Sequence, residues 1–281
     1  MQNVLEILQK CTAYFSEKGI ETPKLDAEIL LAHALGCKRL DLFLRFEEPL
    51  TEDKLAPFRN MVRRRAKREP LQHIVGNVDF FGLKLKCDAR ALIPRNETEE
   101  LCEIATTKLF PDATAKISIL DMGTGSGAIA LAMANHFKDA SVDAVDFSDN
   151  AIELAKENAK NLKLNINIFK SNWFENVEKK YNLILANPPY LTDKEVKEAS
   201  PEVRDFDPIT ALVAKDEGLQ DLRTILSQAT QYLEDSAVII CECGLNQPQI
   251  LAKEATVKYG FTLAETVADL SHRERFLICK K

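Results

Sequence analysis

The stretch that decides the fold is Ile117-Ser118-Ile119-Leu120-Asp121-Met122-Gly123-Thr124-Gly125-Ser126-Gly127, which runs on into Ala128-Ile129-Ala130-Leu131-Ala132-Met133-Ala134. Its apolar start predicts a buried strand, its glycines a tight turn, and its alanine-rich end a helix. Glycine lets the chain turn sharply and lets a ligand reach main-chain atoms that a side chain would cover. The stretch therefore predicts a strand, turn and helix of a wound α/β sheet, with a ligand on the turn.

The turn also indicates which ligand binds. The glycine spacing is G-x-G-x-G, with Ala128 at the place of the third glycine of a dinucleotide fingerprint, and the acidic Asp121 precedes the turn. A carboxylate there does not suit a phosphate but suits a cation, and S-adenosylmethionine carries an ammonium and a sulfonium. We therefore expect S-adenosylmethionine to be bound by Gly123, Thr124, Gly125, Ser126 and Gly127.

Short apolar segments alternate with amphipathic helices from about residue 92 onward, which predicts a mostly parallel, Rossmann-like sheet wound with helices. The segment 142–145 ends at Asp146, where an acid can bind both hydroxyls of a ribose. The segment 166–169 is followed by Asn172 and Trp173, where an adenine ring would lie. Because parallel strands end at one edge of a sheet, we expect these side chains and the glycine turn to form a single cofactor site.

A further strand over 181–186 leads into Asn187-Pro188-Pro189-Tyr190. Two prolines remove two backbone donors and stiffen the loop, so the Pro188 carbonyl is free to accept a hydrogen bond. The Asn187 oxygen and this carbonyl can each accept one proton of an N–H₂ group while Tyr190 stacks on its plane. The loop thus predicts a site for a planar nitrogen, in which orientation and carbonyl acceptors promote methyl transfer without a strong base.

The first 70 residues predict a small helical bundle. Thr22-Pro23 begins a helix whose apolar stripe stops at Gly36, and Thr51 begins another. Residues 80–85 alternate as in a hairpin strand. We expect a helical domain over 1–72, a β-hairpin connector over 73–91 and a catalytic domain over 92–281. One dense basic run, either a solvated helix face or a docking surface, comprises Arg59, Arg63, Arg64, Arg65, Lys67 and Arg68.

Composition excludes several other classes of protein. The chain has 281 residues, a net charge of −6, no apolar run long enough for a membrane span and no secretory leader pattern. Its seven cysteines are scattered through apolar stretches, which favours a reducing cytoplasm, and its four histidines lie far apart, which argues against a metal site. We expect a cytoplasmic monomer without metal, membrane contact or stable nucleic-acid binding.

These motifs together resemble the HemK/PrmC methyltransferases, which modify the glutamine of the Gly-Gly-Gln motif in peptide-chain release factors. The resemblance extends beyond the catalytic loop to nearly the whole chain, through the stretches Arg68–Gly76, Leu92–Glu99, Pro201–Arg204, Pro208–Ala214 and Asp269–Phe276. Two positions depart from the family pattern. Asn172 stands where aspartate is usual, so Trp173 is the surer adenine contact, and His272 stands where glycine is common.

The resemblance implies roles for individual residues. Backbone atoms of Gly123–Gly127 would contact the methionine part of S-adenosylmethionine, Asp146 its ribose and Trp173 its adenine. Asn187 would lie between cofactor and substrate, and with Pro188 and Pro189 it would hold the glutamine amide, with Tyr190 on its face. The helical domain would dock the release factor through the basic run.

Three alternatives remain open at this point. A glutamine of a ribosomal protein presents the same amide, and the catalytic motifs cannot distinguish it. Adenine and guanine also present a planar N–H₂ group, although such enzymes must capture a base, and neither the acidic balance nor the absence of an evident recognition insertion favours that. A non-catalytic cofactor-binding protein is the third, and the intact Asn187, Pro188 and Tyr190 argue against it.

Overall fold

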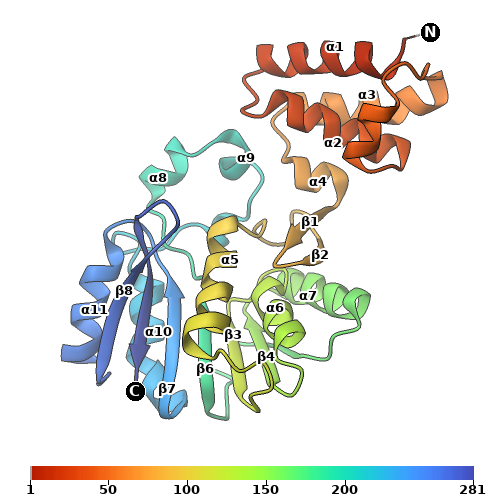
Figure 1. Cartoon of the computed structure of the whole chain (residues 1–281). Coiled ribbons are helices and arrows are strands. Elements are labelled where there is room, and N and C mark those ends of the chain that lie inside the picture. Colours follow the sequence, from red (N-terminus) through yellow and green to blue (C-terminus); the bar gives the residue numbers. More distant parts are fainter. Residues whose placement is uncertain (1) are drawn as a thin grey trace. The chain divides into compact units, whose positions relative to one another are not determined.

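The computed structural model describes residues 2–281, and the chain divides into two compact units (Figure 1). Unit 1 comprises the chain up to Gly76 together with Ser200–Phe206. Unit 2 comprises Asn77–Ala199 and Asp207–Lys281. The expected hairpin therefore belongs to unit 2, and a short segment from the C-terminal half belongs to unit 1, which the sequence pattern did not indicate.

Unit 1 is helical, as predicted. Asn3 begins its first helix with a reciprocal capping box to Glu6. Pro23 begins the second, and Gly36 ends it in a left-handed conformation, although the Thr22 hydroxyl donates to Asp26 rather than capping the backbone. Apolar faces of these helices enclose a core around Phe15. The elements are α1 (Val4–Glu17), α2 (Pro23–Leu35), the 3₁₀ helix η1 (Arg39–Leu44), α3 (Glu52–Ala66), α4 (Leu71–Val75) and α9 (Pro201–Arg204).

Unit 2 contains a seven-stranded sheet in the order β5-β4-β3-β6-β7-β9-β8. The first five strands of this order are parallel, and β9 and β8 complete the sheet in antiparallel pairing. The confirmed fold is thus a mostly parallel α/β sheet. Its strands are β3 (Ser118–Met122), β4 (Ser141–Asp146), β5 (Asn167–Lys170), β6 (Tyr181–Ala186), β7 (Leu233–Glu242), β8 (Leu263–Ala268) and β9 (Glu274–Lys280). A separate hairpin is formed by β1 (Asn77–Phe80) and β2 (Leu83–Lys86).

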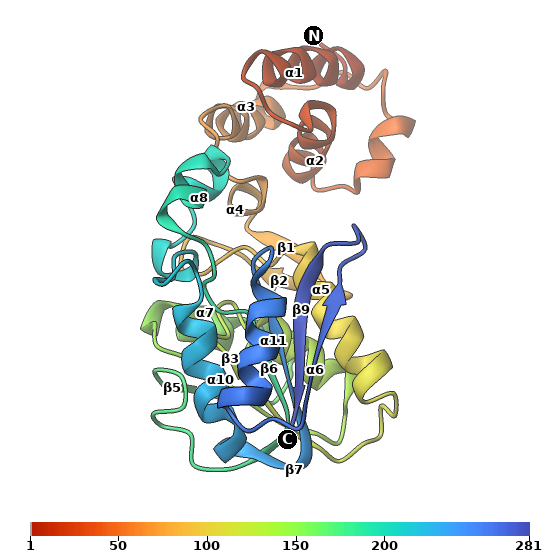
Figure 2. The same cartoon turned by 90° about the vertical axis from the view of Figure 1, so that its left-hand side faces the viewer.

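Helices cover both faces of the sheet, as Figures 1 and 2 show. One core layer joins the sheet to α5, α6 and α7, and the other joins it to α10 and α11. Burial on both faces explains why the central strands are almost wholly apolar. The helices of this unit are α5 (Asn96–Glu103), which continues into a π-helical segment η2 (Ile104–Leu109), α6 (Ala128–His136), α7 (Asp149–Leu162), α8 (Asp193–Glu198), the 3₁₀ helix η3 (Ile209–Ala211), α10 (Gln220–Tyr232) and α11 (Gln247–Lys258).

The strand order places the site. From β3 the chain moves outward to β4 and β5, and it then returns to add β6 on the other side of β3. A crevice forms at such a switch point, outside the carboxyl ends of the strands. The glycine turn follows β3 and the Asn187 loop follows β6, so the two sequence motifs lie at neighbouring strand ends.

Candidate functional site

A cavity of about 360 Å³ opens at this edge of the sheet, within unit 2. It brings together segments from several strand ends and from the chain that precedes α5. Most of the residues predicted from the sequence line it, namely Gly123, Thr124, Gly125, Ser126, Asp146, Asn172, Trp173, Asn187, Pro188 and Pro189. Within residues 2–281, Gly127 and Tyr190 are not part of its lining.

The glycine turn has the backbone conformation that its sequence predicts. Gly123, Gly125 and Gly127 have positive φ angles of 70°, 56° and 85°, a region that favours glycine. Gly127 also permits close packing, because a Cβ there would lie 3.2 Å from the Cβ of Ala155 on α7. Gly127 is therefore a structural part of the turn, whereas residues 123–126 face the cavity.

Within residues 2–281, Asp121 is not part of the cavity lining, whereas the sequence suggested that its carboxylate suits a cationic ligand. Its side chain is fully buried and accepts hydrogen bonds from the Thr124 hydroxyl at 2.6 Å and from the Ala130 backbone N–H at 3.1 Å, both at Oδ2. Its Oδ1 has no hydrogen-bond partner among the described residues. Burial raises the pKa of Asp121 to about 7. The carboxyl group thus ties the turn to α6 instead of binding a cation in the cavity.

Asp146 and Trp173 form the adjoining part of the wall. Asp146 accepts hydrogen bonds from the backbone N–H groups of Gly125 and Ser148, each at 2.9 Å, on different carboxylate oxygens. Each oxygen keeps a lone pair that can accept a hydroxyl proton. The Trp173 ring packs over the turn, because a Cβ on Gly123 would lie 3.5 Å from it. These positions suit a ribose and a flat ring.

Asp221, which the sequence did not single out, lines the cavity on α10. Burial raises the pKa of its carboxyl group, and a hydrogen bond from the Trp173 side chain opposes that shift. This bond holds the indole in place at the cavity wall. Asp221 lies far from Trp173 in the sequence, and no local motif marks it.

The Asn187 loop lines the cavity with a side-chain amide held in place. The Asn187 Nδ2 donates to the Thr98 hydroxyl at 2.9 Å, which leaves Oδ1 to accept a hydrogen bond from a molecule in the cavity. Pro188 and Pro189 line the cavity beside it. Thr98 is 4% exposed and also lines the cavity. The sequence analysis did not identify Thr98 as a site residue.

Tyr190 lies outside the cavity lining and has polar partners of its own. Its hydroxyl donates to Glu242 Oε1 at 2.9 Å and accepts from Arg275 at 2.8 Å. The Arg275 guanidinium also lies 5.1 Å from the centre of the tyrosine ring. These contacts hold the hydroxyl end of the side chain, and the place of the ring over a substrate amide stays a prediction from the sequence.

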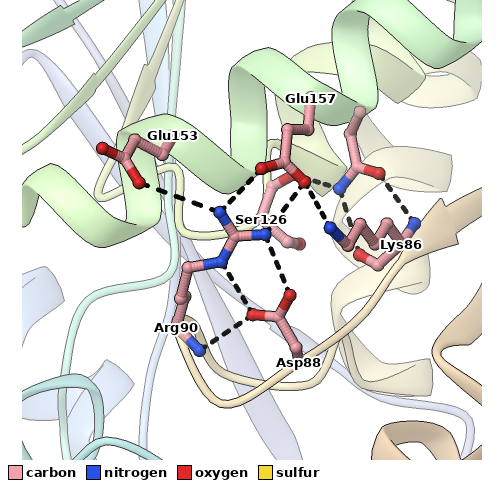
Figure 3. Close-up of polar contacts among 7 residues, drawn as sticks. Lys86, Asp88, Arg90, Ser126, Glu153 and Glu157 are labelled. Atoms are coloured by element: carbon pink, nitrogen blue, oxygen red, sulfur yellow. Dashed lines mark hydrogen bonds and ion pairs between the residues drawn. The ribbon is translucent and has the colours of Figure 1, made fainter.

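Ion pairs anchor the chain segment around Arg90 to α7, as Figure 3 shows. Arg90 lines the cavity and donates to Asp88 and to Glu157 of α7 at 2.9 Å. Asn158, also on α7, donates to the Ser126 carbonyl at 2.9 Å. Farther along, Arg95 pairs with the buried Asp207 at 2.5 Å. The segment from 90 to 95 is therefore attached to the sheet domain near both of its ends.

Residues 2–281 contain no group of three or more His, Cys, Asp or Glu side chains that could hold a metal ion. No helix in this part of the chain is long and apolar enough to cross a membrane.

Comparisons with known proteins agree with this geometry. Residues 6–76 match the family model of the PrmC N-terminal domain, and residues 102–202 match that of the methyltransferase small domain. A release factor glutamine methyltransferase of Rhodopirellula baltica is 35% identical, and the alignment covers 99% of this chain and 96% of that protein. One of Streptococcus pneumoniae is 42% identical over 80% of this chain and 81% of that protein.

A solved structure shares the fold of the catalytic unit. The crystal structure of a methyltransferase from Pyrococcus furiosus aligns with a TM-score of 0.52 at 19% identity. The alignment covers 72% of this chain and 90% of that chain.

Proposed function

Since this chain belongs to the release factor glutamine methyltransferases, we propose that it methylates the side-chain amide nitrogen of the glutamine in the Gly-Gly-Gln motif of peptide-chain release factors, with S-adenosylmethionine as methyl donor. One observation carries the proposal. Asn187, Pro188 and Pro189 line the same cavity as the glycine turn, Asp146 and Trp173. An amide acceptor site thus adjoins a nucleoside site.

The residues present fit the cofactor. Backbone atoms of residues 123–126 would hold its methionine part, Asp146 its ribose and Trp173 its adenine. When bound, S-adenosylmethionine supplies a methyl group activated by a positively charged sulfur. Asp121 has no direct part in this binding, because it is buried behind the turn.

The loop then acts on the substrate amide. Asn187 Oδ1 and the Pro188 carbonyl would each accept a hydrogen bond from the N–H₂ group, which orients the nitrogen toward the methyl group. Acquiring the methyl group would place positive charge on the amide nitrogen. The two acceptors would stabilise this charge, and loss of one N–H proton to solvent would restore the neutral amide. Tyr190 would lie on the face of the amide, with its hydroxyl held by Glu242 and Arg275.

The helical unit would supply the release-factor docking surface. Within the basic run, Arg63 in the last turn of α3 and Lys67, which caps the C-terminus of that helix, are both exposed and lie four residues apart, so they lie near each other at the end of α3. Arg65 is 6% exposed and cannot take part. A cytoplasmic location and a monomeric state remain predictions from the sequence.

Labelled methyl transfer tests the proposal. Wild-type protein should label an intact release factor but not the same factor with its Gly-Gly-Gln glutamine changed to alanine, ribosomes or DNA. Asn187→Ala should reduce labelling by about 100-fold or more, since it removes an aimed acceptor. Label on ribosomes or DNA, or label that survives the glutamine change, would show that another nitrogen is the substrate.

A further inference from the structure

We propose that Thr98 and Glu242 are positioning residues that fix the Asn187 amide with its oxygen toward the cavity. This inference rests on the proposed function, because it concerns the acceptor of the substrate N–H₂ group. Neither residue contacts the reacting atoms in the proposal. They act through Asn187.

The fold brings these residues together from distant parts of the sequence. Asn187 follows β6, and Glu242 is the last residue of its parallel neighbour β7, so both lie at the carboxyl edge of the sheet. Thr98 lies in the first turn of α5, which packs on β7. The last strand, β9, runs antiparallel to β7 and therefore returns Arg275 to the same edge, where Phe276 is opposite Glu242.

The order of hydrogen bonds decides how the Asn187 amide is oriented. An ionised carboxylate only accepts hydrogen bonds, and Glu242 Oε2 accepts the single hydroxyl proton of Thr98 at 2.8 Å. The Thr98 oxygen can then only accept from Asn187, so Asn187 must present its Nδ2, which lies at 2.9 Å. Oδ1 is left to the cavity. A hydroxyl without the carboxylate could donate or accept, and both amide orientations would then be possible.

The surroundings support a charge on Glu242 despite its complete burial. Burial raises the pKa of this carboxyl group above its usual value, and hydrogen bonds from Thr98 and Tyr190 and the nearby Arg275 oppose part of that rise. The Arg275 guanidinium lies 3.3 Å from Oε1 and is itself only 13% exposed. A buried charge persists where it is paired and hydrogen-bonded. Tyr190 and Arg275 thus maintain the carboxylate that orients Thr98.

The first test replaces the Thr98 hydroxyl. Thr98→Val keeps the shape and removes the bond, and kcat on release factor should fall by about 100-fold because the acceptor is misplaced. Affinity for S-adenosylmethionine should stay within about twofold, since Thr98 has no proposed part in its binding. Thr98→Ser should restore kcat to within about threefold. Thr106→Val is the matched control, because that buried hydroxyl donates to the Cys102 carbonyl and contacts no site residue.

Glu242→Gln supplies the second test. The amide of glutamine can donate to Thr98, which would then donate to Asn187 and turn its oxygen away from the cavity. The loss in kcat should match that of Thr98→Val, and the double variant should lose no more than either alone, since both act through one amide. Multiplicative losses, a Thr98→Ser as defective as Thr98→Val, or full activity in Thr98→Val would each overturn the inference.

A readout without substrate separates this inference from the proposed function. If wild-type protein fails to methylate release factor, the proposed function fails. Nuclear magnetic resonance of the Asn187 side-chain N–H₂ then tests the positioning alone. One of its protons should be protected from exchange in the wild type and in Thr98→Ser, and unprotected in Thr98→Val. Equal exchange in all three proteins would refute the positioning role.

Discussion

Asp121 is a buried acid whose charge opposes folding. Its carboxyl group joins the glycine turn to α6 through Thr124 and Ala130, yet burial raises its pKa from 3.8 to about 7. The folded protein therefore binds this proton more tightly than the unfolded chain does. Stability from the protonated form is present at low pH and is lost as the pH rises from about 4 to about 7.

Asp121→Asn should reveal this cost. The variant cannot ionise, so its free energy of unfolding should exceed that of the wild type by more at pH 8 than at pH 5. Between pH 5 and pH 8 this excess should grow by about 3 kcal/mol, which corresponds to about two pKa units. Urea unfolding at the two pH values measures it. The same difference between variant and wild type at both pH values would contradict the shifted pKa.

At the residue scale, the sequence predicted which residues lie at the strand ends, but it did not predict the direction in which their side chains point. Asp146, Trp173 and Asn187 line the cavity because each follows a recognisable strand, and parallel strands end together. Asp121 also ends a strand, but helices cover both faces of this sheet, so an acid there can face α6 instead. The Tyr190 hydroxyl is held by Arg275, which lies 85 residues later in the sequence, on β9. No pattern near Tyr190 indicates this contact.

At the element scale, α7 supports the cavity through a single buried amide. Asn158 is 1% exposed and donates to the carbonyls of Ser126 and Lys86, at 2.9 and 3.1 Å. It also accepts from the Lys86 N–H at 2.7 Å. One side chain thus joins a helix, the end of the hairpin and the glycine turn.

Asn158→Ala should therefore weaken both fold and cofactor site. Three backbone groups would lose their partner, which we expect to lower the free energy of unfolding by about 3 kcal/mol. Affinity for S-adenosylmethionine should fall as well, because Ser126 is part of the turn. The matched control on α7 is Glu153→Ala, whose side chain is 70% exposed and 3.9 Å from Arg90, and which should change stability by less than about 0.5 kcal/mol. Urea unfolding measures the change in stability, and calorimetry measures the affinity for S-adenosylmethionine. Equal effects of the two variants would contradict the role of Asn158 in joining α7 to the glycine turn.

The elements themselves follow the sequence pattern to different degrees. Local periodicity and residues that start or stop an element mark the parallel strands and the helices after Thr22 and Thr51. All of these elements are present. The antiparallel strands β8 and β9 were not predicted, although β9 delivers Arg275 to the site. Pairing between segments far apart in sequence depends on tertiary packing, which no local pattern records.

At the scale of the whole molecule, unit 1 is built from two separate segments of the chain. Arg65 on α3 donates to Asp26 at 2.6 Å and to Glu202 at 2.8 Å, and Arg68 donates to the same Glu202. Arg64 is paired with Glu69. These three of the six cations in the basic run are therefore engaged in ion pairs within unit 1, and the partner that Arg65 and Arg68 share, Glu202, lies 137 residues from Arg65, where the sequence did not reveal it. Reversing the charges of Arg63, Arg64 and Arg65 together would confuse docking with unfolding, because it would leave buried acids unpaired.

The exposed part of the run gives a cleaner test of docking. Arg63→Glu with Lys67→Glu changes two exposed cations four residues apart and should leave stability nearly unchanged. If this face of α3 meets the release factor, KM for release factor should rise by about tenfold at low salt, and less at high salt, because exposed charges are screened. Affinity for S-adenosylmethionine should not change.

The matched control reverses an equivalent pair in unit 2. Lys156→Glu with Lys160→Glu also changes two exposed cations four residues apart on one helix, α7, and alters the net charge by the same amount. Steady-state methylation at two salt concentrations compares the two double variants. A salt-dependent rise in KM confined to the α3 pair would assign docking to that face. An equal rise in KM in both double variants would show that net charge alone causes the effect. No rise in KM in either double variant would place the docking surface elsewhere on the chain.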